Sequence, residues 1–392
     1  MSGTHTTTRV AAALVIAQLS AIALAQSPAG ARRPSPEVEA LNPPVPAGLV
    51  LSEERRVPAE KKAAAYKDPK WTAPRTSWGH PSLQGTWSTD DMHGIPFDRP
   101  EALGTQEFLN DQQFVERARR QQAGSEHAAN VETFHRVAWG ARSFGFSSLV
   151  VDPPNGRTPA LTADGRARAA AVAGKGTFGP GPFDAFEDFS LYDRCIARGL
   201  NAGMNAVLYG NGLVIAQSPD SVSITYEMVH ETRVIPLDGR AHLAEAVTQY
   251  TGNSRGHFDG DTLVVETSGF RDNTSVTGSA PNSKALRTTE RIRRVDPEMI
   301  EYRITVDDPA TYTAPFTVRA MWTTQPGYTV YEYSCHEGNF AVGGGLAGER
   351  AFEREVADAK RKGLPPPKRA SMIEIYSAPA EGAEVFDINK RE

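Results

Sequence analysis

Short runs in which apolar and polar residues alternate occupy the chain from about residue 206 to residue 334. A period of two predicts β-strands, and the dipeptides Asn211-Gly212 and Asp259-Gly260 between such runs are typical of tight hairpin turns. Strands at this regular, short spacing predict a mostly β protein: an antiparallel barrel or sandwich, lipocalin-like, with a few peripheral helices. The expected strands cover residues 144–152, 206–217, 222–235, 261–267, 287–295, 301–306, 317–323 and 329–334.

The strongest strand pattern lies between residues 221 and 270, and the segment 331–339 (YEYSCHEGN) is its predicted partner. Residues 222–235 are expected to form one long strand or a strand pair. Side chains two positions apart share a face of a strand. Tyr226, Met228 and His230 are therefore expected on one side of this segment.

The N-terminus has the pattern of a secretory signal peptide. Arg9 precedes an apolar run at residues 10–24, and Ala23-Leu24-Ala25 supplies the small residues of a cleavage site. A run of roughly 15 apolar residues is too short to span a bilayer comfortably. We expect cleavage after residue 25, a periplasmic or secreted protein, and no membrane span in the mature chain.

The remainder divides into three parts. Residues 26–76 are rich in Pro, Ala and charge, and are predicted to be a linker or loosely attached arm. Residues 77–363 are expected to form a single β-rich domain, followed by a tail at 364–392. Within the domain, helices are predicted before Gly124, at the start of residues 164–183, and after Gly348 up to the prolines at 365–367.

Composition limits the classes of partner. The chain has 392 residues, 40% hydrophobic, so it can bury a sizeable core. Its net charge is −5, and no basic patch with interleaved aromatics occurs, which argues against a nucleic-acid partner. Its two cysteines, Cys195 and Cys335, favour one disulfide in an oxidising compartment. The alternative is a reactive thiol beside His336.

Three familiar motifs occur in contexts that do not suit them. Residues 252–256 (GNSRG) match a nucleophile elbow, but a hairpin follows instead of a helix, so a turn is expected. Residues 343–348 (GGGLAG) match a dinucleotide motif without a βαβ unit, and are interpreted as a loop. Glu227 and His230 have the E-x-x-H spacing of di-iron proteins. That site requires a helix, whereas a strand is expected at these residues, so the two side chains should point to opposite sides.

A looser group of residues is the candidate site. His230, His242, His336 and Glu337 lie at predicted strand ends, and histidine with a carboxylate is suited to acid–base catalysis near neutral pH. The alternatives are that His230 is a core histidine and that Glu337 belongs to a turn. A metal held by the three histidines also stays open, although no cofactor is favoured. The expected substrate-binding residues are Tyr226, Arg240, Arg255 and Tyr333.

Arg255 could instead be a structural residue beside Asp259 and Asp261. The leading hypothesis is an exported enzyme, of lyase, hydratase or hydrolase type, that acts on a small, partly apolar molecule. The alternatives are a non-catalytic, lipocalin-like periplasmic binding protein and a histidine-ligated metalloenzyme.

Three strings carry a resemblance to a known family: VIPLDGR at 234–240, SRGHFDGDTLVVET at 254–267 and YEYSCHEGN at 331–339. Upstream, LQGTW at 83–87 and FGFSSLVVDPPNGRTPALT at 144–162 are similar to the same family. It is a family of uncharacterised secreted proteins of environmental bacteria. The resemblance covers roughly residues 78–350 and implies export, but it assigns no activity to any residue.

Overall fold

The computed structural model describes residues 62–63, 68, 70–130, 142–176, 179–207, 209–272, 274, 280–325 and 327–369. The predicted signal peptide, most of the predicted linker and most of the predicted tail lie outside the described residues. Residues 71–76, within the predicted linker, lie against the sheet: Ala73 is buried and Arg75 pairs with Asp261.

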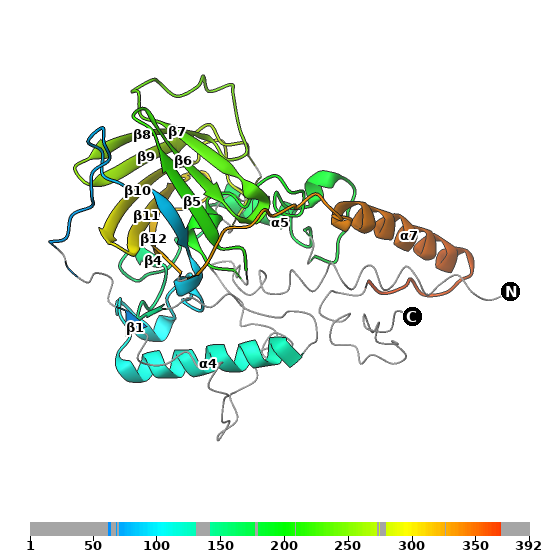
Figure 1. Cartoon of the computed structure of the whole chain (residues 1–392). Helices are drawn as coiled ribbons and strands as arrows, with labels where there is room; N and C mark the ends of the chain where they lie inside the picture. Colours follow the sequence, from blue (N-terminus) through cyan, green and yellow to red (C-terminus); the bar gives the residue numbers. More distant parts are fainter. Residues whose placement is uncertain are drawn as a thin grey trace, which may run out of the picture.

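One antiparallel sheet of ten strands dominates the molecule (Figure 1). The strand order is β7-β6-β5-β2-β12-β11-β10-β9-β8, with β4 beside β12, and a small parallel pair joins β1 to β3. The mostly β prediction is therefore confirmed. The strands are β1 (Lys62–Ala63), β2 (Gly85–Ser88), β3 (Ser143–Phe144), β4 (Val150–Asp152), β5 (Gly212–Gln217), β6 (Ser221–Tyr226), β7 (Thr232–Pro236), β8 (Asn253–Asp259), β9 (Thr262–Ser268), β10 (Arg287–Asp296), β11 (Met299–Asp307) and β12 (Phe316–Thr323).

The two end strands of this sheet, β7 and β8, approach each other closely. A Cβ on Gly256 in β8 would lie 2.7 Å from Ile235 Cγ2 in β7 and 3.0 Å from Leu237 Cδ2. Glycine allows this approach because it carries no side chain. In the described part of the chain no hydrogen-bonded ladder joins the two strands, so the sheet is not closed into a barrel.

Large and polar side chains fill the concave side of the sheet. Tyr302 in β11 stacks on Trp322 in β12 with ring centroids 4.4 Å apart. Arg233 in β7 makes two hydrogen bonds of 3.0 and 2.5 Å to Glu290 in β10, which also accepts one of 2.9 Å from the Tyr302 hydroxyl. A buried charge pair is tolerated when it is fully hydrogen-bonded. This network links strands from both halves of the sheet.

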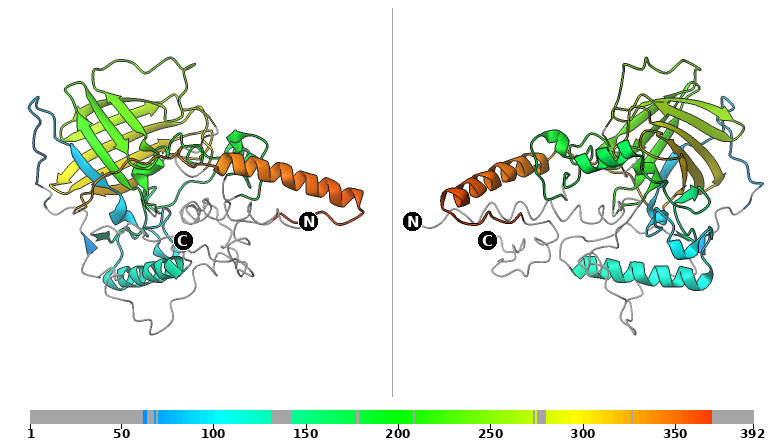
Figure 2. Two further views of the ribbon diagram at one scale, coloured as in Figure 1. Left: turned by 45° about the vertical axis from the view of Figure 1, so that its right-hand side comes forward. Right: turned by 180° about the vertical axis from the view of Figure 1, so that it is seen from behind.

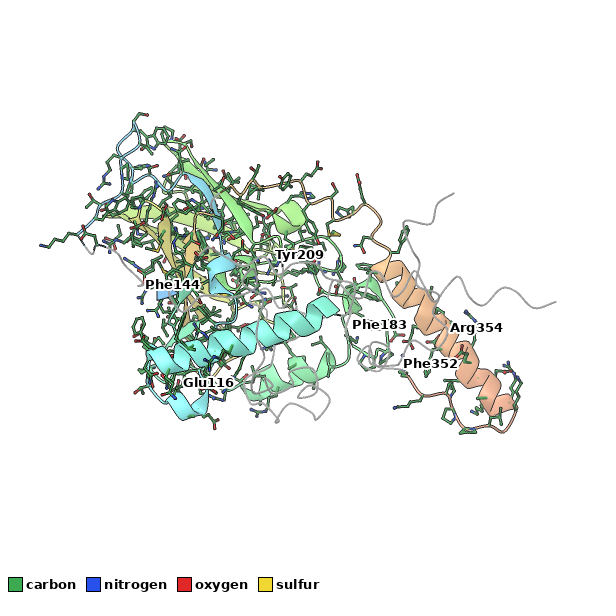
Figure 3. The ribbon with its side chains drawn as sticks, turned by 60° about the horizontal axis from the view of Figure 1, so that its bottom comes forward. Glu116, Phe144, Phe183, Tyr209, Phe352 and Arg354 are labelled. Atoms are coloured by element: carbon green, nitrogen blue, oxygen red, sulfur yellow. A yellow bond between two sulfur atoms is a disulfide. The ribbon has the colours of Figure 1, made fainter. Side chains whose placement is uncertain are left out.

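The longer helices lie outside the sheet. α4 packs beside β3, where Arg117 donates to the carbonyls of Phe144 and Phe146. α7 points away from the sheet, and Phe352 and Arg354 lie near the middle of this helix (Figures 2 and 3). Among the described helices none is long and apolar enough to cross a membrane. The helices are η3 (Asp90–Met92), η4 (Glu101–Leu103), α4 (Asp111–Asn130), α5 (Ala163–Ala171), η5 (Phe186–Asp188), α6 (Asn201–Met204), η6 (Met228–His230) and α7 (Ala341–Arg361).

Two predicted helix boundaries are wrong. The glycine-rich segment 343–348, expected to be a loop, is the first part of α7, and α4 continues past Gly124. A glycine inside a helix costs only about 1 kcal/mol relative to alanine, which packing can offset. At Gly345 the packing is visible, because an added Cβ would lie 2.4 Å from Cζ of Phe189.

The predicted hairpin at Asn211-Gly212 is also wrong. Gly212 begins β5, and the chain reverses later, where Ser218 N donates to Ser221 O at 2.9 Å. The Asn211 side chain is buried, accepts from Val207 N at 2.8 Å and donates to Asp90 at 2.8 Å. Asn211 therefore holds the loop that precedes β5.

The segment 222–235 is a strand pair, but its side chains do not alternate between two faces over the whole segment as predicted. β6 ends at Tyr226, and the chain turns through η6, where Val229 and His230 have φ values of 69° and 49°. This turn interrupts the alternation of side chains between the two faces of the sheet. Tyr226 is buried on the concave side of the sheet, while His230 is exposed, so the two do not share a face.

The predicted strand at 329–334 does not form. After β12 the chain runs past the β6–β7 turn without entering the sheet. Glu227 accepts hydrogen bonds from the Tyr328 hydroxyl and from Tyr331 N, and His230 Nδ1 donates to Tyr333 O at 2.9 Å. These side-chain contacts occupy backbone groups that a strand partner would have used.

Candidate functional site

A pocket of about 340 Å³ lies beside the β6–β7 turn, outside the concave side of the sheet. Two segments far apart in the sequence form it: the irregular chain around residues 192–209 and the segment 332–341. Its lining residues are Tyr192, Asp193, Tyr209, Glu332, Tyr333, Ser334, Cys335, Glu337, Gly338, Asn339 and Ala341.

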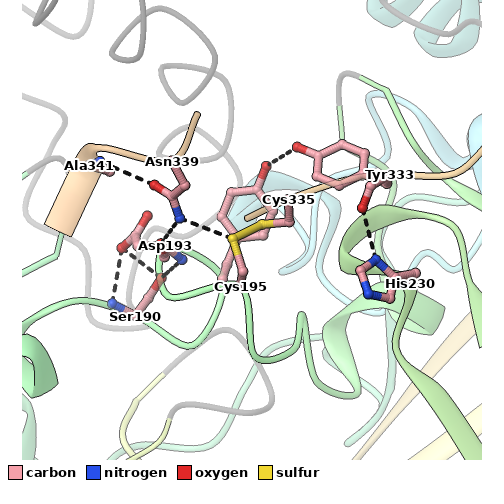
Figure 4. Close-up of a disulfide and its surroundings, with 9 residues drawn as sticks. Ser190, Asp193, Cys195, His230, Tyr333, Cys335, Asn339 and Ala341 are labelled. Atoms are coloured by element: carbon pink, nitrogen blue, oxygen red, sulfur yellow. Dashed lines mark hydrogen bonds between the residues drawn. A yellow bond between two sulfur atoms is a disulfide. The ribbon is translucent and has the colours of Figure 1, made fainter. Parts of the chain in front are cut away.

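A disulfide joins the two walls of the pocket (Figure 4). Cys195 and Cys335, 140 residues apart in the sequence, are bonded with an S–S distance of 2.11 Å, so the predicted disulfide is confirmed. Asn339 adds a second link, because its side-chain amide donates to Asp193 O at 2.8 Å and lies 3.0 Å from Cys195 Sγ. The pocket walls are therefore fixed relative to each other.

Three tyrosines supply the aromatic surface of the pocket. The hydroxyls of Tyr192 and Tyr333 are 3.0 Å apart, and the rings of Tyr209 and Tyr333 are nearly parallel with centroids 6.4 Å apart. Their apolar edges pack on a small core that includes Val207 and Met228. Burial raises the pKa of both Tyr192 and Tyr209, so these hydroxyls stay protonated and can donate hydrogen bonds.

The charged groups that line the pocket are all carboxylates. Asp193 is only 7% exposed, and it accepts hydrogen bonds from Ser190 N at 3.0 Å and Ser190 Oγ at 2.8 Å. Glu332 and Glu337 are exposed at the rim, and no ion pair to either occurs within the described ranges. No Lys, Arg or His is among the lining residues.

Arg198 is a half-buried cation near the tyrosines. Burial lowers the pKa of Arg198, while charge interactions with Tyr192 and Tyr333 oppose that change. Its Nη2 has no hydrogen-bond partner in the described structure. Glu231, whose own pKa is raised by burial, interacts with Arg198. Arg198 therefore interacts both with the tyrosines and with a carboxyl group.

The four predicted catalytic residues do not meet in one hollow. Glu337 lines the pocket and His336 is exposed beside it. His230 is outside the pocket, holding the Tyr333 backbone carbonyl, and His242 donates to Asn253 O at 2.9 Å next to β8. No group of three His, Cys, Asp or Glu side chains among the described residues is arranged to hold a metal ion.

Of the predicted substrate-binding residues, Tyr333 lines the pocket and the other three do not. Tyr226 is 3% exposed on the concave side of the sheet. Arg240 pairs with Asp238. Arg255 donates to the carbonyls of Arg240 and Ala241 at 3.2 and 3.0 Å, which holds that loop against β8.

The two acidic residues expected beside Arg255 have other partners: Asp259 pairs with Arg291 and Asp261 with Arg75. In the segment 252–256, Ser254 lies within β8 and its Oγ is 2.9 Å from Thr267 Oγ1. It is therefore placed in a strand and not in a strand-to-helix turn.

Sequence patterns missed Tyr192, Asp193, Arg198 and Tyr209. These residues belong to an irregular segment without strand or helix periodicity. The one available signal was Cys195, because a disulfide to Cys335 brings its neighbours next to residues 332–341. No family model, curated protein or solved structure matches this chain.

Proposed function

We propose that this protein binds a small molecule in the tyrosine-lined pocket. The observation that carries the proposal is a hollow of about 340 Å³ with three tyrosines on its surface and a disulfide across its walls. Ligand sites are typically concave and aromatic, with a few polar groups that fix orientation. Here the three tyrosines supply the aromatic surface, the Tyr192–Tyr333 hydroxyl pair supplies a donor, and the carboxylates supply acceptors.

Export is part of the proposal. The predicted signal peptide, the resemblance to secreted proteins and the single disulfide all support an oxidising compartment. The close approach of β7 and β8 supports a lipocalin-like barrel. The Arg233–Glu290 pair and the Tyr302–Trp322 stack occupy its concave side, however, so we place the ligand at the end of the sheet, beside the β6–β7 turn.

A thermal-shift screen with small aromatic, hydroxylated and amine-bearing molecules tests the binding function. Molecules that raise the melting temperature of the wild type should lose that effect in Tyr209→Ala, because the variant loses one aromatic wall. Tyr331→Ala is the matched control, since Tyr331 is 72% exposed and does not line the pocket. Equal ligand shifts in Tyr209→Ala and the wild type would contradict the proposal.

Acid–base catalysis, of lyase, hydratase or hydrolase type, is the second candidate. Glu337 lines the same pocket as the paired hydroxyls of Tyr192 and Tyr333, so a carboxylate base and a phenolic acid are available together. Mass spectrometry of the molecules bound to purified wild type and Glu337→Gln separates the two candidates. An enzyme should retain a substrate in the variant that the wild type has converted. The same bound molecules in both proteins would favour binding alone.

A further inference from the structure

The charge of the pocket points to one class of ligand. We propose that the pocket takes an organic cation, whose ammonium group lies against the tyrosine rings and between the acidic side chains. This inference rests on the proposed binding function, and it names the chemistry of the ligand.

The first observation is the sign of the charge. Asp193, Glu332 and Glu337 line the pocket, and no basic side chain lines it. Asp193 is nearly buried, and it accepts two hydrogen bonds from Ser190. Within the described residues no cation pairs with it. A ligand cation would supply the missing counter-charge.

The second observation is the aromatic surface. Tyr192, Tyr209 and Tyr333 come together from different parts of the chain, and Tyr209 and Tyr333 are nearly parallel. The face of an aromatic ring attracts a cation, and sites with several such rings next to carboxylates recognise alkylated ammonium groups. A metal ion would need clustered ligands instead, and no such cluster occurs among the described residues.

An anionic ligand fits the same pocket less well. The tyrosine hydroxyls could donate to an anion, and Arg198 interacts with Tyr192 and Tyr333. Arg198 does not line the pocket, however, and it also interacts with Glu231. An anion would have to pass the rim carboxylates Glu332 and Glu337 before it reached those donors. The pocket is also larger than a single tetramethylammonium group needs, so we expect an apolar or hydroxylated body on the cation.

Titration calorimetry at low ionic strength with three probes of matched shape tests this inference. The probes are choline, the uncharged 3,3-dimethylbutan-1-ol and the anionic 3,3-dimethylbutanoate. We expect choline to bind at least tenfold more tightly than the alcohol, and its affinity to fall as salt is added. The butanoate should bind more weakly than either.

Substitutions in the pocket test which side chains produce the preference for choline over the alcohol. Glu337→Gln and Glu332→Gln should each weaken choline binding by about threefold or more and leave binding of the alcohol unchanged. Tyr333→Leu should weaken choline binding while retaining an apolar wall. Glu355→Gln, an exposed position on α7 away from the pocket, is the charge-matched control and should have no effect.

Each alternative result overturns the inference. Equal affinity for choline and the alcohol, or preference for the butanoate, would show that the pocket does not select a cation, while the binding function would stand. If none of the three probes binds, the cation assignment fails, and the independent thermal-shift screen with Tyr209→Ala decides the binding function itself.

Discussion

Asp90 begins η3 and His93 follows its end, and burial shifts the pKa values of these two groups in opposite directions. Burial raises the pKa of Asp90 from 3.8 to about 6, and the nearby carboxylates Asp91 and Glu227 act in the same direction. Burial lowers the pKa of His93 from 6.5 to about 4. Asn211, which precedes β5, donates to Asp90 at 2.8 Å, and His93 interacts with the backbone of Val207 in the same loop, so both pKa shifts affect the stability of this part of the fold.

The sign of each effect follows from linkage. Asp90 has a higher pKa in the folded state than in the unfolded state. Its contribution to stability is therefore complete below about pH 4 and is lost as the pH rises to about 6. His93 has a lower pKa in the folded state than in the unfolded state. Its contribution to stability is therefore complete above pH 6.5 and is lost as the pH falls to about 4. Each shift is roughly 2 pH units, or ~3 kcal/mol at 1.36 kcal/mol per unit.

These two contributions cancel in the wild type, so their combined effect on stability is flat between about pH 4 and pH 6. Asp90→Asn removes one of them and keeps the oxygen that accepts from Asn211 Nδ2 at 2.8 Å. The variant should lose stability relative to the wild type by ~3 kcal/mol on going from pH 6.5 to pH 4. At pH 7 it should be the more stable of the two proteins, by up to the same amount.

Urea denaturation followed by circular dichroism at pH 4, 5, 6 and 7 measures this difference. Asp220→Asn is the control, because Asp220 is exposed in the turn between β5 and β6 and should leave the pH profile of the wild type unchanged. The reasoning is refuted if Asp90→Asn and the wild type differ by the same free energy at every pH.

Three further predictions concern stability. Glu290→Gln leaves the buried guanidinium of Arg233 without its carboxylate, and should cost about 3–5 kcal/mol by urea denaturation. Replacing both cysteines by serine should cost up to about 5 kcal/mol in the chain-entropy model, and should abolish ligand binding because the pocket walls are no longer joined. Gly345→Ala should lower the melting temperature, because its Cβ would meet Phe189, whereas Gly348→Ala, with open space around it, should stabilise α7 by about 1 kcal/mol.

The sheet could be predicted because its signals are local. Asp259-Gly260 forms the hairpin between β8 and β9, and the alternation in β10 and β11 matches their antiparallel pairing. The turn at Val229 and His230 could not be predicted in the same way. Valine is β-branched and disfavours a positive φ, so the turn depends on contacts with other parts of the chain, such as the hydrogen bond from His230 to Tyr333 O.

The pocket and the missing strand at 329–334 have the same physical origin. A strand there would have extended the sheet and turned alternate side chains to opposite faces. Instead, Glu227 and His230 take up backbone groups of this segment, and the disulfide draws its end toward Cys195. Tyr333 and the acidic residues around it consequently face the irregular chain that carries Tyr192 and Tyr209. A pocket exists at this end of the sheet because the segment is held by side chains and a covalent bond, and not by a neighbouring strand.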